Sequence, residues 1–189
     1  VEQMGAAPAP AAAARRLLPA SLSRPPRIVG RDAAWSALDA AWEAGRTFIV
    51  IGEAGLGKSR LLAEWTAGRS GLLSIAAAPG DEMLPYACIA RLLRAFGGPV
   101  PAEPLRRELA RLLPEWGPAP ASPGHPSLLA TAVEAQVGMA PQAGWRGVVV
   151  DDLHHADAPS RTLLQRLSAQ PGLAWGFASR PLAGAGWQA

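Results

Sequence analysis

Residues 52–59 read Gly52-Glu53-Ala54-Gly55-Leu56-Gly57-Lys58-Ser59, and they directly follow the apolar run of residues 47–51. The segment matches G-x-x-x-x-G-K-[ST] at every position. Glycines let the backbone curl until consecutive N–H groups point at phosphate oxygens. A helix that begins at the end of such a loop turns its positive dipole end toward the same anion. The stretch therefore predicts a buried strand, a phosphate-binding loop and a helix over residues 58–67.

The side chains of this loop predict how a nucleoside triphosphate binds, and ATP is the nucleotide we expect. Lys58 is expected to reach the β- and γ-phosphates, and the hydroxyl of Ser59 is expected to ligate Mg²⁺. Of the 18 basic residues in the chain, 17 are arginine and Lys58 is the single lysine. This bias indicates that position 58 needs a compact ammonium rather than a planar guanidinium. We include Gly52 to Ser59 and the following Arg60 in the predicted nucleotide-binding set.

Helical and strand-like patterns alternate along the rest of the chain. We expect Asp32 to cap the first helix, because its short carboxylate can accept a backbone N–H there. Strands that alternate with helices imply a parallel sheet covered on both faces. The predicted helices cover residues 32–44, 58–67, 86–96, 103–113, 127–137 and 159–169, and the predicted strands cover residues 47–51, 72–77, 147–151 and 173–178.

Two carboxylates, Asp151 and Asp152, follow the valine-rich strand of residues 147–151. The carboxyl ends of parallel strands line the ligand crevice of such a sheet. Asp151 is therefore expected to face the phosphate-binding loop and to hold Mg²⁺ through water. Asp152 stands where many ATPases have a glutamate that activates water. Because aspartate is shorter than glutamate, we expect any hydrolysis to be slow.

Three further residues near the strand ends are candidates for the site. Asp157 either caps the helix over residues 159–169 or lines the site, and we favour the cap. His155 is either a catalytic base or a simple loop residue, and we favour the loop residue. Arg180 follows the fourth strand. If that strand lies beside the first, Arg180 points toward the γ-phosphate and can sense it or stabilise transferred charge.

Composition limits the class of protein. The 189 residues are 49% hydrophobic and 17% charged, which is typical of a globular domain with a real core. The single cysteine, Cys88, excludes a disulfide framework within one chain and fits a reducing cytoplasm. The net charge of +3 comes without a dense basic run, so nucleic-acid binding by this segment is not implied.

No apolar run approaches the roughly 20 residues that span a bilayer. Residues 1–27, rich in Ala and Pro, are interpreted as a linker rather than a signal peptide.

With these pieces in place, the chain resembles the AAA-type ATPase domain of large bacterial transcriptional regulators of the LuxR and SARP/BTAD types. These regulators belong to the STAND class of signal-transducing ATPases, and their ATPase domain is similar to origin-recognition-like AAA modules. The resemblance covers about residues 25–182. The stretches that carry it are Val29-Gly30-Arg31, Gly52 to Ser59, Leu84-Pro85-Tyr86, Arg111-Leu112-Leu113-Pro114-Glu115, Val148 to Asp157, and Ser179-Arg180-Pro181.

The resemblance implies a P-loop NTPase fold of the ASCE/AAA type, an α/β/α sandwich of three layers with a mainly parallel sheet. It implies that Val29, Gly30 and Arg31 border the adenine pocket. It also implies that Asp151 is the Mg²⁺ carboxylate, with Asp152 as its acidic neighbour, and that Arg180 lies near the γ-phosphate. His155 departs from the family, which usually has tryptophan at this position.

The resemblance further implies a domain over residues 28–182 that stops after the fourth strand. The Gly- and Ala-rich residues 183–189 show no helix or strand pattern and are expected to be an unstructured tail. We therefore expect a fragment, in which DNA is reached only through domains that the chain does not contain. The leading hypothesis is a cytoplasmic, ATP-dependent switch with weak Mg²⁺-dependent ATPase activity and possible ATP-dependent self-association. Two alternatives stay open, a P-loop small-molecule kinase or other metabolic ATPase, and a degenerate fragment that binds nothing.

Overall fold

The computed structural model describes residues 28–97, 99 and 101–181. The linker expected over residues 1–27 and the tail expected over residues 183–189 lie outside them. The helices are α2 (Asp32–Glu43), α3 (Lys58–Ala67), α4 (Ala87–Phe96), α5 (Leu105–Leu109), α6 (Pro126–Gly138) and α7 (Ala158–Ser168), with short 3₁₀ turns η1 (Asp81–Met83), η2 (Pro114–Trp116), η3 (Ala140–Ala143) and η4 (Leu153–His155). The strands are β1 (Phe48–Ile51), β2 (Leu72–Ala76), β3 (Gly147–Asp151) and β4 (Ala174–Ser179).

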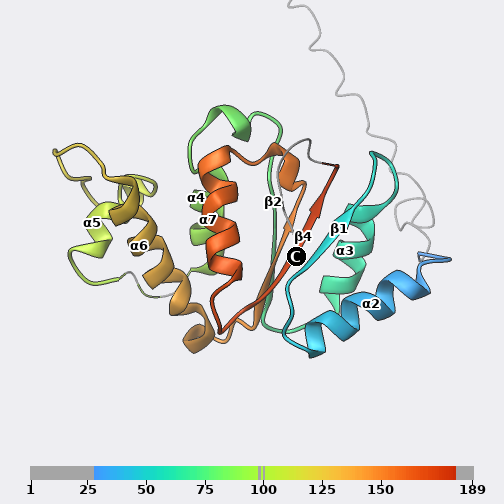
Figure 1. Ribbon diagram of the computed structural model, residues 1–189. Coiled ribbons are helices and arrows are strands. Elements are labelled where there is room, and N and C mark those ends of the chain that lie inside the picture. The colour runs from blue at the N-terminus through green and yellow to red at the C-terminus, as the bar shows by residue number, and fades with distance from the viewer. Residues whose placement is uncertain (1–27, 98, 100, 182–189) are drawn as a thin grey trace, which may run out of the picture.

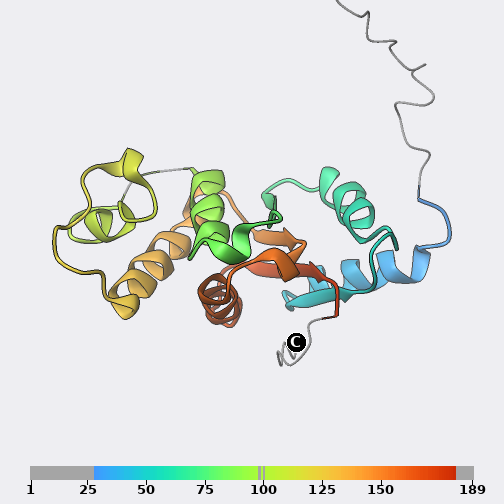
Figure 2. The ribbon, with the colours of Figure 1, turned by 90° about the horizontal axis from the view of Figure 1, so that it is seen from above.

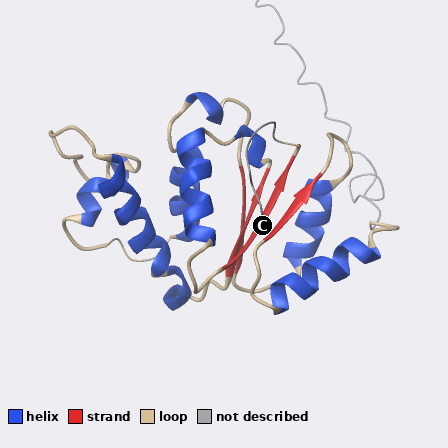
Figure 3. Cartoon of the chain, viewed as in Figure 1, coloured by secondary structure: helices blue, strands red, loops and turns tan. Residues whose placement is uncertain are grey.

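The four strands form one sheet in the order β1-β4-β3-β2, and every neighbouring pair is parallel. The strands lie in the centre of the molecule with helices on both sides (Figure 3). The predicted parallel α/β fold is therefore confirmed. Because all four strands run the same way, their carboxyl ends meet at one edge of the sheet, where ligands bind in folds of this kind.

Each face of the sheet is covered by a different pair of helices (Figures 1 and 2). Helices α4 and α7 cover one face, and α5 and α6 lie beyond them as an outer layer. Helices α2 and α3 lie on the opposite side. The strands alternate accordingly, so Val148 and Val150 belong to the larger apolar core and Val149 to the smaller one. None of the helices in the described ranges is long and apolar enough to cross a bilayer.

Trp65 joins α2 and α3 to the sheet. Its side chain is fully buried, and its ring meets the rings of Trp42 and Phe48 edge to face at centroid distances of 5.9 and 5.6 Å. Its indole N–H donates to Asp39 of α2 at 2.8 Å. The Arg69 guanidinium lies 4.1 Å from the Trp65 ring centroid and forms an ion pair with the same carboxylate. These contacts fix the orientation of α3, which begins at the phosphate-binding loop.

Several expected boundaries differ from the observed ones. Asp32 does not cap α2: it is the first helical residue, Arg31 holds the cap position, and no side chain caps this helix end. The helix expected over residues 103–113 is only the five residues of α5, because Pro104 precedes its start and Pro114 opens the turn η2. Tyr86 lies outside α4 with a left-handed φ of 63°, which a helix interior does not allow. The remaining ends shift by one residue at most, and α3 and β3 have the predicted bounds.

Close packing at Gly147 gives a test of the fold. A Cβ added there would lie 2.7 Å from the Ala174 carbonyl oxygen of the neighbouring strand and 2.4 Å from the Trp42 ring. We expect Gly147→Ala to lower the free energy of unfolding by about 2 kcal/mol through overpacking. Urea denaturation of the two proteins measures the difference. Gly138→Ala is the matched control, because nothing lies within 4 Å of its Cβ position, and an equal loss in both variants would contradict this packing.

Candidate nucleotide-binding site

The phosphate-binding loop leaves β1 while it is still bonded to β4. The Gly52 N–H donates to the Ser179 carbonyl at 3.2 Å, which extends the β1–β4 ladder into the first residue of the loop. Gly55 and Gly57 then adopt φ values of 80° and 78°, in the left-handed region that favours glycine. Helix α3 begins at Lys58, immediately after Gly57. The strand, loop and helix predicted from the sequence are all observed.

The loop wraps around the ammonium of Lys58. The Nζ atom donates to the carbonyl oxygens of Gly52 at 2.7 Å and Glu53 at 3.0 Å. The side chain therefore folds back over the loop instead of extending into solvent. Ser59 is the next residue, exposed at the first turn of α3. An ammonium, a hydroxyl and the N-terminus of a helix are thus gathered at one place, which suits a polyphosphate.

Asp151 ends β3, two strands away from β1. Its carboxylate accepts the backbone N–H of Asp152 at 2.7 Å through Oδ1. Asp152 has a left-handed φ of 50°, uncommon for a residue other than glycine. Such backbone conformations concentrate at functional sites. The chain turns sharply here, and the half-buried Asp152 side chain approaches His154, with 4.0 Å between Oδ1 and Nδ1.

His154 is not among the site residues predicted from the sequence. Its side chain is 11% exposed, and neither ring nitrogen has a hydrogen-bond partner among the described residues. Burial lowers the pKa of this imidazole, and the neighbouring His155 lowers it further. Asp152 opposes the shift, and the positive charges of Arg180 and Lys58 make smaller contributions in the lowering direction. His154 therefore lies within the electrostatic reach of three predicted site residues. Its place two residues after Asp152 is the sequence signal that could have indicated it.

Arg180 directly follows β4, and β4 lies between β1 and β3. Arg180 was expected near the γ-phosphate only if the fourth strand lies beside the first, and β4 does lie beside β1. The Arg180 side chain is exposed at the edge of the sheet where the loop and Asp151 also lie. Its charge acts on His154, as does that of Lys58. Its role toward a γ-phosphate stays a prediction.

Asp157 caps a helix, as the sequence predicted. Its Oδ1 accepts the Ser160 N–H at 2.8 Å in the first turn of α7. The same oxygen accepts the Tyr86 N–H at 2.9 Å, at the start of α4. One buried carboxylate therefore ties together the N-termini of two helices that are far apart in sequence. The His155 ring lies against the His154 ring, with centroids 4.1 Å apart and the planes tilted by 39°, so His155 packs within the loop.

The residues expected to border an adenine pocket lie beside α3. The Arg31 guanidinium donates to the Leu56 carbonyl of the phosphate-binding loop. Val29 is 89% exposed and does not pack against the core. A cavity of about 310 Å³ opens next to these residues, and it is lined by Ile28, Arg31, Asp32, Trp35 and Glu64. Arg60 lies at the start of α3 and donates to Glu64 at 3.0 Å.

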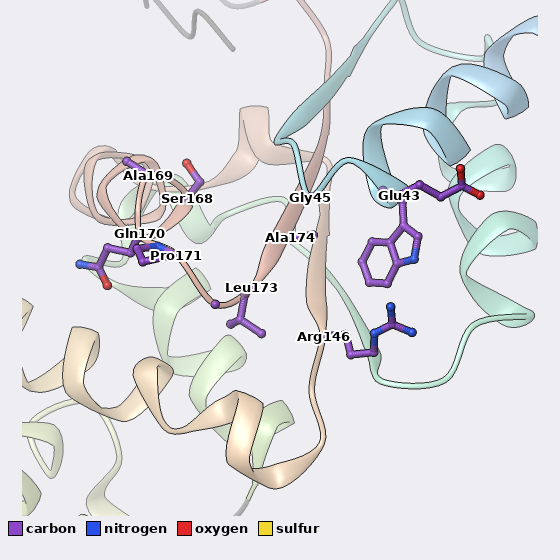
Figure 4. A pocket seen from close by; sticks show the side chains of 11 residues that line it. Glu43, Gly45, Arg146, Ser168, Ala169, Gln170, Pro171, Leu173 and Ala174 are labelled. Atoms are coloured by element: carbon purple, nitrogen blue, oxygen red, sulfur yellow. The ribbon is translucent and has the colours of Figure 1, made fainter.

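A second cavity, of about 630 Å³, lies at the opposite end of the sheet (Figure 4). It is bounded by Gly45 before β1, Arg146 before β3 and the turn that leads into β4. These are the amino ends of the strands. Volume alone favours this cavity, but ligands of open parallel sheets bind at the carboxyl ends, and the glycine-rich loop lies there. The loop edge therefore stays the predicted place of the nucleotide.

The donors at the loop edge fit Mg²⁺ better than a metal held by protein alone. No cluster of three or more His, Cys, Asp or Glu side chains that could bind a metal occurs within the described ranges. Mg²⁺ beside a nucleotide takes only one or two protein ligands and completes its octahedron with phosphate oxygens and water. The Ser59 hydroxyl and the Asp151 carboxylate supply the oxygen donors that such an ion prefers.

A parallel sheet with a glycine-rich loop after its first strand, and a carboxylate at the end of the strand two positions away, defines a P-loop nucleoside triphosphatase. The comparison with protein families agrees. A family model described as the AAA ATPase domain matches residues 27–178, and the chain belongs to this family. Membership implies a domain that binds a nucleotide. A search of curated proteins finds no match.

The double cap at Asp157 gives a second test. We expect Asp157→Ala to lower the free energy of unfolding by about 3 kcal/mol, because two backbone N–H groups lose a charged acceptor. Urea denaturation measures this loss. Asp157→Asn keeps an acceptor oxygen and should lose less. Asp32→Ala is the control, since Asp32 makes no cap bond, and a loss there equal to that of Asp157→Ala would contradict the assignment.

Proposed function

We propose that this chain is an ATP-binding switch domain that hydrolyses ATP slowly within a bacterial transcriptional regulator or a related signalling protein. The observation that carries the proposal is the glycine-rich loop that closes around Lys58, at the same edge of the sheet as Asp152 and Arg180. This edge of the sheet therefore combines cations with carboxylates. Beside a polyphosphate they have opposite tasks, since the cations neutralise charge and the carboxylates hold Mg²⁺ and water.

In this proposal the N–H groups of the loop surround the phosphates, and Lys58 exchanges its two carbonyl partners for β- and γ-phosphate oxygens. Ser59 and Asp151 hold Mg²⁺, which neutralises phosphate charge when it is bound. Arg31 lies on the side of the loop where we place the nucleobase, and its guanidinium already donates to the Leu56 carbonyl. The arrangement needs no large movement of β1 or α3.

Slow turnover follows from the residue at position 152. Asp152 carries one methylene fewer than glutamate, and its carboxylate is turned toward His154. A water held between this carboxylate and the γ-phosphate is therefore activated weakly. Because the pKa of His154 is lowered by burial and by nearby positive charge, its ring is neutral at pH 7 and can accept a hydrogen bond. Arg180 is exposed at the same edge and senses the γ-phosphate.

The regulatory part of the proposal concerns the loops between the strands and helices. ATP favours one arrangement of the loops at Asp151 and Arg180, and hydrolysis returns the domain to the other. Self-association in the ATP state, and contact with DNA through other domains, belong to this proposal. The compartment we propose is the cytoplasm.

Nucleotide binding is tested by Lys58→Ala. We expect this change to weaken ATP binding by about 100-fold, because charge-assisted hydrogen bonds to the phosphates are lost. Isothermal titration of the 189-residue chain with a slowly hydrolysed ATP analogue and Mg²⁺ measures the affinity. Arg46→Ala is the control, an exposed cation at the other end of β1. Equal affinity in wild type and Lys58→Ala would refute the proposed site.

Turnover is tested at position 152. We expect Asp152→Glu to raise the rate of phosphate release by about tenfold, because the longer side chain brings the base closer to the attacking water. Asp152→Asn should lower the rate while ATP affinity is kept. A phosphate-release assay under single-turnover conditions separates the two effects. If Asp152→Asn hydrolyses ATP as fast as the wild type, this carboxylate is not the base.

A further inference from the structure

The cavity at the amino ends of the strands has no part in the nucleotide site. Its volume of about 630 Å³ lies well within the range of small-molecule sites. Its walls come from the end of α2, from Arg146 before β3 and from the turn between α7 and β4 (Figure 4). Because this is the end of the parallel sheet opposite to the phosphate-binding loop, a ligand here is separate from the nucleotide.

Arg146 is held in one orientation at this cavity. A Cβ atom added to Gly71 would lie 3.2 Å from its Cγ and 3.5 Å from its Cδ, so the stem of the side chain lies over the Gly71 backbone. The guanidinium at the end of this stem lies 5.7 Å from the centroid of the Trp42 ring. An arginine that is fixed at both its stem and its head loses less conformational entropy when it binds a ligand.

The guanidinium of Arg146 has hydrogen-bonding capacity to spare. Within residues 28–97, 99 and 101–181 it forms no hydrogen bond or ion pair, and its one contact of this kind is with the Trp42 ring. A guanidinium that lies over an aromatic ring still directs its N–H groups outward in its own plane. These N–H groups match the two oxygens of a carboxylate or a phosphate.

The carbonyl groups at the helix ends beside the cavity already accept hydrogen bonds. At the end of α2, the Trp42 carbonyl accepts the Gly45 N–H at 3.0 Å. At the end of α7, the Ser168 carbonyl accepts the Thr47 hydroxyl at 3.2 Å. These acceptors therefore do not require a cationic ligand to satisfy them.

The rest of the wall also favours a ligand that supplies acceptors. The Gly172 N–H has no hydrogen-bond partner in the part of the chain that the structure describes. The carboxylate of Glu43 points away from the Arg146 guanidinium (Figure 4). Leu173, which is half-buried, and the exposed Pro171 give the wall an apolar part. Free donors beside an apolar surface suit an anion that carries an apolar group.

We propose that this cavity binds a small organic anion. Arg146 receives its carboxylate or phosphate group through paired N–H···O bonds, and its apolar group lies against Leu173 and Pro171. The site is additional to the proposed ATP site and does not depend on it.

The experiment uses three probes that share a phenyl ring, namely phenylacetate, phenyl phosphate and the neutral phenylacetamide. Titration of the ¹⁵N-labelled 189-residue chain, followed by NMR, reports on the backbone amides of Gly45, Gly172 and Ala174 in the cavity wall. We expect one or both anions to shift these amides with an affinity about tenfold or more above that of phenylacetamide. The anion that binds more tightly identifies the oxyanion as a carboxylate or a phosphate.

Two matched variants test the role of Arg146. Arg146→Gln keeps the Cγ and Cδ positions that lie over Gly71 and removes the charge. We expect it to lower the affinity for the anions by about tenfold, to that of phenylacetamide. Arg46→Gln removes the same charge from an exposed arginine next to Gly45 and should leave all three affinities unchanged.

Three outcomes would overturn the inference. The first is that neither anion shifts the amides of the cavity wall, and the second is that Arg146→Gln binds the anions as tightly as the wild type. The third is an equal loss in Arg146→Gln and Arg46→Gln, because net charge would then explain the binding. Shifts confined to Gly55 and Gly57 count as the first outcome and place the anion at the phosphate-binding loop, so the proposed function stands.

Discussion

The parallel pairing of β1 with β4 is the contact on which the site depends. It continues past the end of β1, where the Gly52 N–H donates to the Ser179 carbonyl. The first residue of the loop and the last residue of β4 are therefore held together, and Arg180 leaves the sheet beside the loop. Because β3 pairs with the other side of β4, Asp151 reaches the same edge. Three segments that are far apart in sequence therefore meet through the two ladders on either side of β4.

Two polar anchors hold the loops that surround this edge. Asp157 accepts the N–H groups of Tyr86 and Ser160, and so joins the turn after β3 to the start of α4. Asp81 is buried and receives a two-pronged contact from Arg91 of α4. The Arg91 guanidinium holds the pKa of the Asp81 carboxyl below its usual value, because it stabilises the ionised form. The segment between β2 and α4 is therefore held at Asp81 by Arg91 and at Tyr86 by Asp157.

The backbone of the site departs from ordinary conformations where the chemistry is expected. Asp152 and Tyr86 are the two described residues other than glycine with positive φ. Asp152 turns the chain so that the His154 ring lies 4.0 Å from the Asp152 carboxylate, and Tyr86 is held by Asp157. A strained conformation persists only where its surroundings determine it. Here the surroundings are the end of β3 and the cap of α7, both rigid parts of the fold.

Local features of the sequence were enough for the parallel α/β fold, the position of the loop and the cap at Asp157. A glycine-rich turn between an apolar run and a helix has few alternative structures, and each of these signals is contained within a few residues. Contacts between distant segments were not readable in this way. Arg31 takes the cap position expected for Asp32, and the prolines at positions 104 and 114 shorten α5. The His154 side chain is largely buried beside Asp152, which places it at the site. The cavity between Trp35 and Glu64 exists only because α2 packs beside α3. Strand order and helix packing depend on burial across the whole chain, which no local pattern contains.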